Sequence, residues 1–282
     1  MASAGGLLYS VTMEIRTMPV EVKDMTLDKV AIGPVSARVY QGAEFAKGPP
    51  IVLFFGGGAF LDQGLGDCPV AHTLASIGAI VVVPDYIGPL GNAFPKPLEV
   101  GFSIFSYLAN KRAGLGDRKS LQLVGGEEAG GNVAAAVALK ARDHFAKELD
   151  GQVLLSPMVD AFMGSASMRE ADAIGMRARW AEGWSQYLSA GVCHPYAAPC
   201  LCSRMSGVAP TLLLTASDDP LRDEAIGYAG RLAEAGNKVR QHVLPAGTGW
   251  PSIYGGTSDD AASWQDSVRQ AFAGFVADIG QH

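Results

Sequence analysis

Short apolar runs alternate along the chain with longer stretches whose apolar positions recur at helical spacing. The runs at 80–83 and 211–214 are apolar on both faces, as strands of a covered parallel sheet must be. Strands are expected at Val35–Tyr40, Ile51–Phe55, Ala79–Pro84, Leu121–Val124, Gln152–Ser156, Thr211–Thr215 and Lys238–Leu244. Helices are expected at about 66–77, 97–113, 129–147, 221–235 and 258–279. This alternation predicts an α/β fold with a mostly parallel central sheet and helices on both faces.

The stretch 157–196 interrupts the alternation. It carries Trp180, Trp184 and Tyr187 at the spacing of one face of an amphipathic helix. We expect this stretch to pack over the carboxyl edge of the sheet, together with about residues 1–25, as a helical cap. Its aromatic side chains favour packing against the core, with lining of a substrate pocket as the alternative. The chain 1–282 is then predicted to form a single domain.

Composition and charge narrow the classes of partner. The formal net charge is −6 and no basic run occurs, which argues against nucleic acid and anionic membrane as partners. No apolar stretch approaches the roughly 20 residues that span a bilayer, and the first residues lack the features of a signal peptide. The four cysteines are too few and too unevenly spaced for a disulfide framework. We therefore expect a cytoplasmic protein.

Four motifs occur in order, each at the end of an expected strand or the start of an expected helix. They are Phe54-Phe55-Gly56-Gly57-Gly58-Ala59-Phe60, then Val83-Pro84-Asp85-Tyr86 with Phe94-Pro95-Lys96-Pro97-Leu98-Glu99, then Gly126-Glu127-Glu128-Ala129-Gly130-Gly131-Asn132, and Ala216-Ser217-Asp218-Asp219-Pro220-Leu221-Arg222-Asp223-Glu224. Together they resemble the hormone-sensitive-lipase-like branch of α/β-hydrolase esterases, from about residue 25 onward. The resemblance implies an α/β-hydrolase fold with a helical cap.

The resemblance also implies roles for individual residues. A glycine triplet after a strand lets backbone N–H groups approach a ligand oxygen, and in related esterases such donors form the oxyanion hole. The implied donors here are Gly57, Gly58 and Ala129. The turn around Glu128 corresponds to the nucleophile elbow, where the small residues Gly126 and Gly130 suit a crowded backbone. Asp219 matches the carboxylate that would orient a catalytic histidine.

The departures from the family pattern affect the chemistry most. Glu128 stands where the family has its serine, and Thr248-Gly249-Trp250 stands where the family has His-Gly-Phe. Phe55 replaces the histidine that opens the oxyanion loop. A serine nucleophile needs both a hydroxyl and a neighbouring base, so these positions argue against Ser–His–Asp ester hydrolysis. Among the histidines, His194 at the end of the cap stretch is the candidate that could reach a pocket, and packing is favoured for the others.

Three hypotheses describe what a glutamate at the elbow does. Glu128 could be a carboxylate nucleophile, although no histidine would then release the intermediate. It could be a general acid/base for elimination, isomerisation, cyclisation or decarboxylation of a small apolar carbonyl compound held by the oxyanion donors. It could instead fold its carboxylate into the oxyanion hole, giving a catalytically silent binding protein. We favour the second, with the third or a weak carboxylesterase as alternatives.

The remaining expectations concern ligands and neighbours of the site. Candidate pocket residues are Phe60, Trp184, Thr248 and Trp250, and we interpret Glu127 as a structural residue. The ligand is expected to be a small apolar carbonyl or ester-like molecule. No cofactor is expected, since Gly56-Gly57-Gly58 lacks the dinucleotide-binding spacing. No metal is expected either, because the spacing of Cys193, His194, Cys200 and Cys202 fits no common zinc site. A homodimer through the last strand is possible by analogy with related esterases.

Overall fold

The computed structural model describes residues 15–43, 48–144, 147–189, 191, 194–250 and 262–281. Within them, an eight-stranded sheet has the order β1-β2-β4-β3-β5-β6-β7-β8. The strands are β1 (Val20–Leu27), β2 (Val35–Gly42), β3 (Ile51–Phe55), β4 (Ile80–Pro84), β5 (Gln122–Glu127), β6 (Gly151–Leu155), β7 (Thr211–Ala216) and β8 (Val239–Leu244). β2 is antiparallel to both β1 and β4, and every other neighbouring pair is parallel. The predicted α/β fold with a mostly parallel sheet is confirmed.

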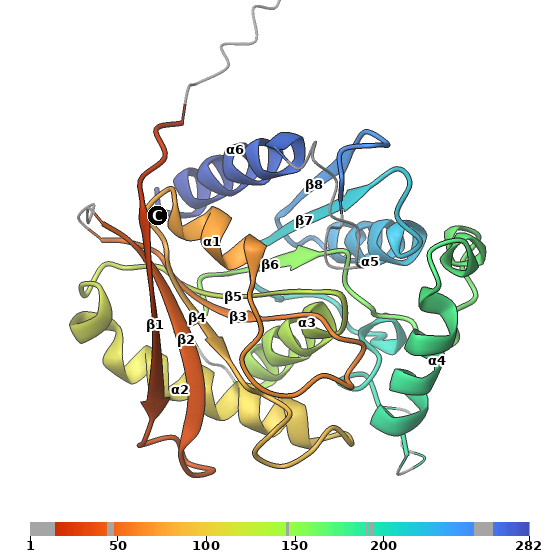
Figure 1. The fold of residues 1–282 in the computed structure, drawn as a ribbon, viewed down its shortest axis with the longest axis horizontal. Helices are drawn as coiled ribbons and strands as arrows, with labels where there is room; N and C mark the ends of the chain where they lie inside the picture. The colour runs from red at the N-terminus through yellow and green to blue at the C-terminus, as the bar shows by residue number, and fades with distance from the viewer. Residues whose placement is uncertain are drawn as a thin grey trace, which may run out of the picture.

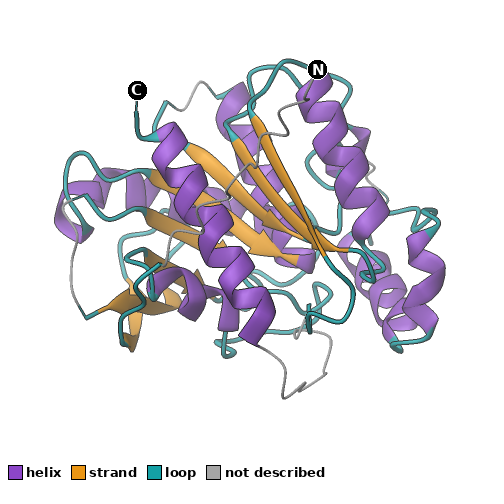
Figure 2. Ribbon diagram, turned by 90° about the horizontal axis from the view of Figure 1, so that it is seen from above, coloured by secondary structure: helices purple, strands orange, loops and turns teal. Residues whose placement is uncertain are grey.

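Helices cover both faces of the sheet (Figures 1 and 2). On one face lie α1 (Pro69–Ala75) and α6 (Ala262–Ile279), and on the other lie α2 (Lys96–Leu115), α3 (Glu128–Asp143) and α5 (Arg222–Glu234). Successive strand residues point to opposite faces, so Phe54 packs in the core beneath α1 and α6 while Phe55 packs in the other core. Because both faces are covered, the central strands are apolar throughout.

The first strand of the sheet is absent from the expected elements. Residues 20–25, which we expected in the cap, belong to β1, and residues 1–14 of that expected cap lie outside the described part of the chain. Six of the eight residues of β1 are exposed, so its sequence lacks the apolar run of a covered strand. Backbone pairing with β2 over its whole length holds β1 at the sheet edge.

The stretch 157–196 contains η1 (Ser167–Asp172) and α4 (Met176–Tyr187), and η2 (Pro199–Leu201) follows it. The buried face of α4 carries Trp180, Trp184 and Tyr187, as the helical spacing predicted. Gly183 lets α4 approach the loop after β3, since a Cβ there would lie 1.8 Å from the carbonyl oxygen of Ala59. This close approach brings α4 to the carboxyl ends of β3 and β5.

Two features of the surface bear on partners. β8 lies at the free edge of the sheet, and its middle residues are exposed. Homodimerisation through this strand stays a prediction. Among the described helices, none combines the length and the apolar character needed to cross a membrane.

Candidate functional site

The site is built on a sharp turn between β5 and α3. Glu128 is the first residue of α3 and has φ = 52°, in the left-handed region that non-glycine residues rarely adopt. A Cβ on Gly126 would lie 2.3 Å from the carbonyl oxygen of Gly130, and a Cβ on Gly130 would lie 2.1 Å from that of Phe55. Side chains are therefore excluded at both positions, which explains the small residues on either side of the glutamate pair.

The Glu128 carboxylate lies in the loop of glycines after β3. Its Oε2 accepts hydrogen bonds from the backbone N–H groups of Gly58 and Ala59, the latter at 2.9 Å. Its Oε1 accepts a hydrogen bond from the indole Nε1 of Trp180 in α4. A Cβ on Gly57 would lie 2.7 Å from Oε2, so glycine there makes room for the carboxylate. Three protein donors thus hold a side chain that is only 2% exposed.

These donors overlap only partly with the expected oxyanion donors. Gly58 contacts the carboxylate as one of them, and Ala59 takes part although it was not predicted. The backbone of Gly57 instead interacts with Glu127. Ala129 is fully buried in the first turn of α3. The role of all these groups toward a substrate oxygen stays a prediction.

Trp180 is a site residue that the sequence did not identify. Its helical spacing predicted a buried face and gave no indication of its hydrogen-bond partner. A buried tryptophan usually finds an acceptor for its indole N–H, and that rule was the available signal. The acceptor is 52 residues earlier in the chain, so only the packing of α4 on the elbow brings the two together.

Asp219, which the sequence matches to the carboxylate of the family's triad, is fully buried after β7. It accepts hydrogen bonds from the backbone N–H of Leu221 at 2.8 Å and from the hydroxyl of Ser156. Ser156 Oγ in turn accepts a hydrogen bond from the indole Nε1 of Trp250 at 2.9 Å. Burial raises the pKa of Asp219 to about 6, while Ser156, Leu221 and Trp250 act in the opposite direction. Neither the Trp250 indole nor the Ser156 hydroxyl titrates near neutrality, so neither can take up a proton as an imidazole does.

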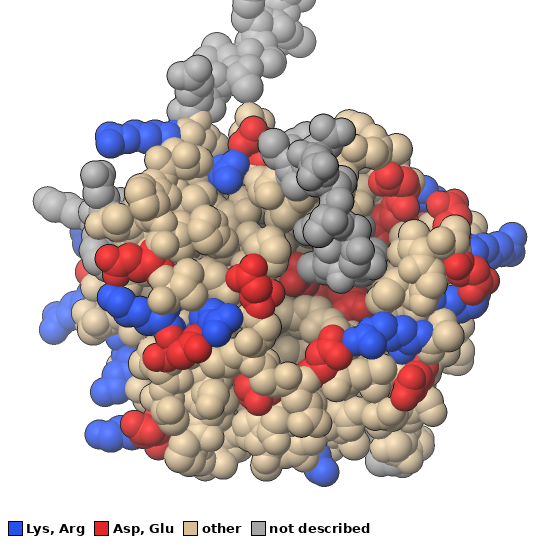
Figure 3. Space-filling view, viewed as in Figure 1, with Lys and Arg blue, Asp and Glu red and all other residues tan. Residues whose placement is uncertain are grey.

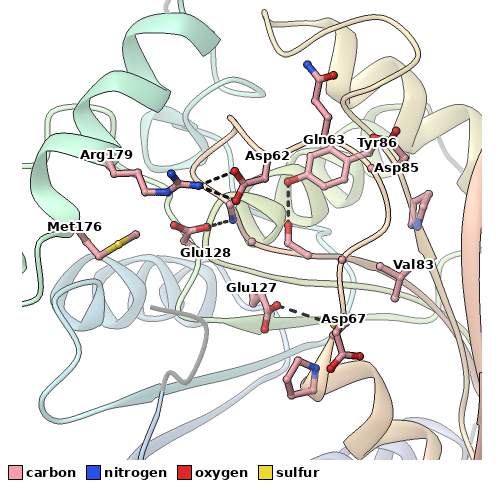
Figure 4. A pocket seen from close by; sticks show the side chains of 18 residues that line it. Asp62, Gln63, Asp67, Val83, Asp85, Tyr86, Glu127, Glu128, Met176 and Arg179 are labelled. Atoms are coloured by element: carbon pink, nitrogen blue, oxygen red, sulfur yellow. Dashed lines mark hydrogen bonds and ion pairs between the residues drawn. The ribbon is translucent and has the colours of Figure 1, made fainter. Parts of the chain in front are cut away.

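A cavity of about 710 Å³ opens beside the elbow, with Glu127 and Glu128 on its wall. Its other acidic lining residues are Asp62, Asp67 and Asp85, and Arg179 is the cationic one. Arg179 donates from Nη2 to both carboxylate oxygens of Asp62, at 2.6 and 2.7 Å. Figure 3 shows acidic side chains around a hollow on this face, and Figure 4 shows the ion pair beside Glu128. The cavity is therefore acidic, whereas an apolar pocket was expected.

The expected pocket residues do not line this cavity, and their contact with a ligand stays a prediction. Phe60 is fully buried and stacks on Tyr187, with ring centroids 4.1 Å apart. Trp184 packs against the same two rings, and Trp250 packs against Trp264 on the opposite face of the sheet. Thr248 is half-buried in the loop after β8. The cavity wall includes none of these side chains and, among the described residues, no histidine. His194 instead stacks against Phe94.

Glu127 is on the cavity wall although we interpreted it as structural. Its Oε1 lies 4.0 Å from the thiol of Cys68, and its Oε2 has no hydrogen-bond partner among the residues that the structure describes. Burial raises the pKa of Glu127 to about 8 and the charge of Glu128 acts in the same direction, while the Gly57 backbone opposes them. Burial also raises the pKa of the Cys68 thiol. A neutral carboxyl group therefore faces the cavity near pH 7.

Comparison with known proteins identifies relatives along most of the chain. A family model described as alpha/beta hydrolase fold matches residues 52–248. Esterase LipI of Mycobacterium tuberculosis is 29% identical over 253 residues, which cover 83% of this chain and 78% of the relative. The solved structure of a thermostable esterase from Pseudomonas putida gives a TM-score of 0.77 at 27% identity, covering 92% of this chain and 83% of that one. The gibberellin receptor GID1A of Arabidopsis thaliana is 26% identical, covering 71% of this chain and 62% of the relative.

Proposed function

The chain belongs to the α/β-hydrolase family of esterases, and within it we propose a small-molecule-binding protein that does not hydrolyse esters. The observation that carries the proposal is the position of the Glu128 carboxylate. Its Oε2 accepts hydrogen bonds from Gly58 and Ala59, the loop N–H groups that an esterase of this kind would offer to a carbonyl oxygen. While Glu128 stays there, the N–H groups of Gly58 and Ala59 cannot polarise an ester carbonyl.

The same contacts favour a silent site over acid–base catalysis by Glu128. A general base must reach the substrate proton that it removes. Both Glu128 oxygens already accept hydrogen bonds, and the Trp180 donor comes from the cap helix α4. Leaving those donors would strand two backbone N–H groups and an indole N–H in a buried site, which is costly. Glu128 therefore serves best as an internal ligand of the oxyanion loop.

The former base end of the triad supports the same proposal. Asp219 accepts a hydrogen bond from Ser156, and Ser156 accepts one from Trp250. A hydroxyl and an indole, rather than an imidazole, therefore lie beside this carboxylate. Neither group shuttles protons near neutral pH. Without a serine at 128 and a base at this end, the two steps of ester hydrolysis lack their proton acceptor.

A binding role on this fold has a counterpart among the relatives. GID1A is described as a receptor of gibberellin and matches this chain over 71% of its length. The cavity of about 710 Å³ lies within the size range of small-molecule sites. Because LipI and other relatives are esterases, weak carboxylesterase activity is the competing function to test.

The test is a p-nitrophenyl acetate assay of the wild-type protein, Glu128→Ala and Glu128→Ser/Thr248→His, with Glu128→Ser as the matched control. We expect wild-type and Glu128→Ala rates equal to buffer. Removing the carboxylate and supplying both a hydroxyl and an imidazole is expected to raise the rate of the double variant above that of Glu128→Ser. A wild-type rate more than about tenfold above buffer would contradict the proposal. If that rate survived Glu128→Ala, another residue would be the nucleophile.

A further inference from the structure

We propose that the cavity beside the elbow binds the protonated amine of an amphiphilic small molecule, with Glu127 as the principal acceptor and Asp67 as a nearby anionic group. This inference rests on the proposed binding function and names the class of ligand. It differs from the apolar carbonyl compound that the sequence led us to expect.

The first observation is the unpartnered oxygen of Glu127. The residue is 3% exposed and lines the cavity, yet its Oε2 has no hydrogen-bond partner among the described residues. Buried carboxyl groups almost always have partners, because losing water without a replacement costs free energy. A ligand that donates a hydrogen bond at this point would supply the missing partner.

The second observation is the charge on the cavity wall. The cationic side chain lining it, Arg179, is already bound to both oxygens of Asp62. Asp67 is exposed just before the N-terminus of α1, and its Oδ1 accepts a long hydrogen bond of 3.5 Å from the Tyr40 hydroxyl. Glu127 is directed toward the segment that carries Asp67, as Figure 4 shows. These two carboxyl groups face the cavity without a cation from the described chain.

The charge of the cavity wall also argues against an anionic ligand. A carboxylate or phosphate would meet Asp67 and Asp85 on the same wall, and like charges in a partly enclosed site repel strongly. An ammonium group has three donors and a positive charge, so it matches both the unpartnered oxygen and the field of the cavity. Charge-assisted hydrogen bonds of this kind are about twice as strong as neutral ones.

The rest of the wall indicates what the amine is attached to. Val83, Pro84, Tyr86 and Met176 line the same cavity. Tyr86 is held in place because its hydroxyl donates to the carbonyl oxygen of Gly56 at 2.9 Å. Apolar walls with a few polar groups at one point orient an amphiphilic ligand. An aromatic or aliphatic primary amine therefore fits the cavity better than a polyamine or a metal ion.

The experiment compares three probes of one shape and different charge: benzylamine, benzyl alcohol and benzoate. Their dissociation constants are measured by calorimetry at pH 7 with the full chain. We expect benzylamine to bind at least about tenfold more tightly than benzyl alcohol, and benzoate to bind most weakly. An ammonium group beside Glu127 favours the charged form of this carboxyl group, which glutamine cannot adopt. Glu127→Gln should therefore lose about tenfold in affinity for benzylamine and leave benzyl alcohol unchanged. Glu21→Gln, at an exposed acidic residue of β1 that pairs with Lys23 outside the cavity, is the control expected to change neither.

Several outcomes would overturn the inference. These are equal binding of amine and alcohol, tighter binding of benzoate, no binding of any probe at their solubility limits, or an amine preference that persists in Glu127→Gln. If Glu127→Gln does not fold, Asp67→Asn replaces it, since Asp67 is exposed and its substitution leaves the core intact. The esterase assay is independent of these probes. If the protein hydrolyses no esters and shows no preference for the amine, the inference about the amine fails and the proposed function stands. If it hydrolyses esters and prefers the amine, only the proposed function is overturned.

Discussion

Two carboxyl groups that are neighbours in the chain have opposite surroundings. Glu128 has both oxygens engaged by donors from three different residues. Glu127 interacts with the Gly57 backbone and lies 4.0 Å from the Cys68 thiol, and its Oε2 has no hydrogen-bond partner among the described residues. The Glu128 carboxylate is bound by the backbone of the glycine loop, and the Glu127 carboxyl group faces the cavity. The difference shows that burial alone does not make a carboxyl group a functional candidate, because the donors within reach decide its role.

The elbow backbone creates this difference. Glu127 ends β5 with extended backbone, and Glu128 begins α3 with φ = 52°. The change in direction sends one side chain toward the loop after β3 and the other toward the segment before α1. A regular strand would also separate two successive side chains, but it would not bring one of them onto two consecutive backbone N–H groups.

The largest effect is expected from breaking the elbow itself with Gly130→Ala. The new Cβ would lie 2.1 Å from the carbonyl oxygen of Phe55 and 2.4 Å from that of Gly56, and neither backbone group has room to move. We expect a loss of about 4 kcal/mol or more in the free energy of unfolding, measured by urea denaturation. Gly227→Ala in α5 is the matched control, since nothing lies within 4 Å of its Cβ. It should change stability by about 1 kcal/mol at most, in the stabilising direction. Equal losses in the two variants would refute the crowding argument.

The second-largest effect is the pH dependence that Glu127 gives to the free energy of unfolding. The folded protein keeps a proton on Glu127 up to about pH 8, whereas the unfolded chain releases it near 4.5. Between these values the native state binds more protons, so the free energy of unfolding falls as pH rises. Glu127→Gln removes this dependence. The difference in the free energy of unfolding between the wild-type protein and Glu127→Gln should therefore change by a few kcal/mol across this pH range, on the order expected for a pKa shift of this size.

Urea denaturation of both proteins at pH 5 and pH 8.5 measures that change. Asp219, whose pKa is also raised, is present in both proteins, so its contribution cancels in the comparison. Parallel curves for the wild-type protein and Glu127→Gln would show that Glu127 is ionised at neutral pH in the folded state.

The smallest effect concerns the donor that the cap gives to Glu128. Trp180→Phe removes the indole N–H from a charged acceptor, which typically costs about 1.5–3 kcal/mol. Trp184→Phe, on the same helix and against Phe60, controls for the loss of indole volume. We expect Trp180→Phe to be the more destabilising by about 1–2 kcal/mol in thermal or urea unfolding. If Trp184→Phe costs as much, the bond between cap and elbow contributes no net stability.

Local sequence patterns determined the fold of this protein and the position of its elbow. Apolar runs such as 80–83 require a covered sheet, and the glycines around Glu128 require a crowded turn, so the fold and the position of the elbow followed from the chain. The hypothesis that Glu128 stands at the position of the family's serine also came from the sequence. The edge strand β1 was not, because its exposed residues are held by pairing with β2, which no local pattern records.

Only the tertiary structure decided what the two glutamates do. Trp180 lies 52 residues from Glu128, and Cys68 lies 59 residues from Glu127, so neither partner is visible in the spacing of a motif. The same holds for Trp250, which donates a hydrogen bond to Ser156 across 94 residues. Hydrogen bonds act over about 3 Å, and the sequence determines which groups exist, whereas packing determines which of them come that close.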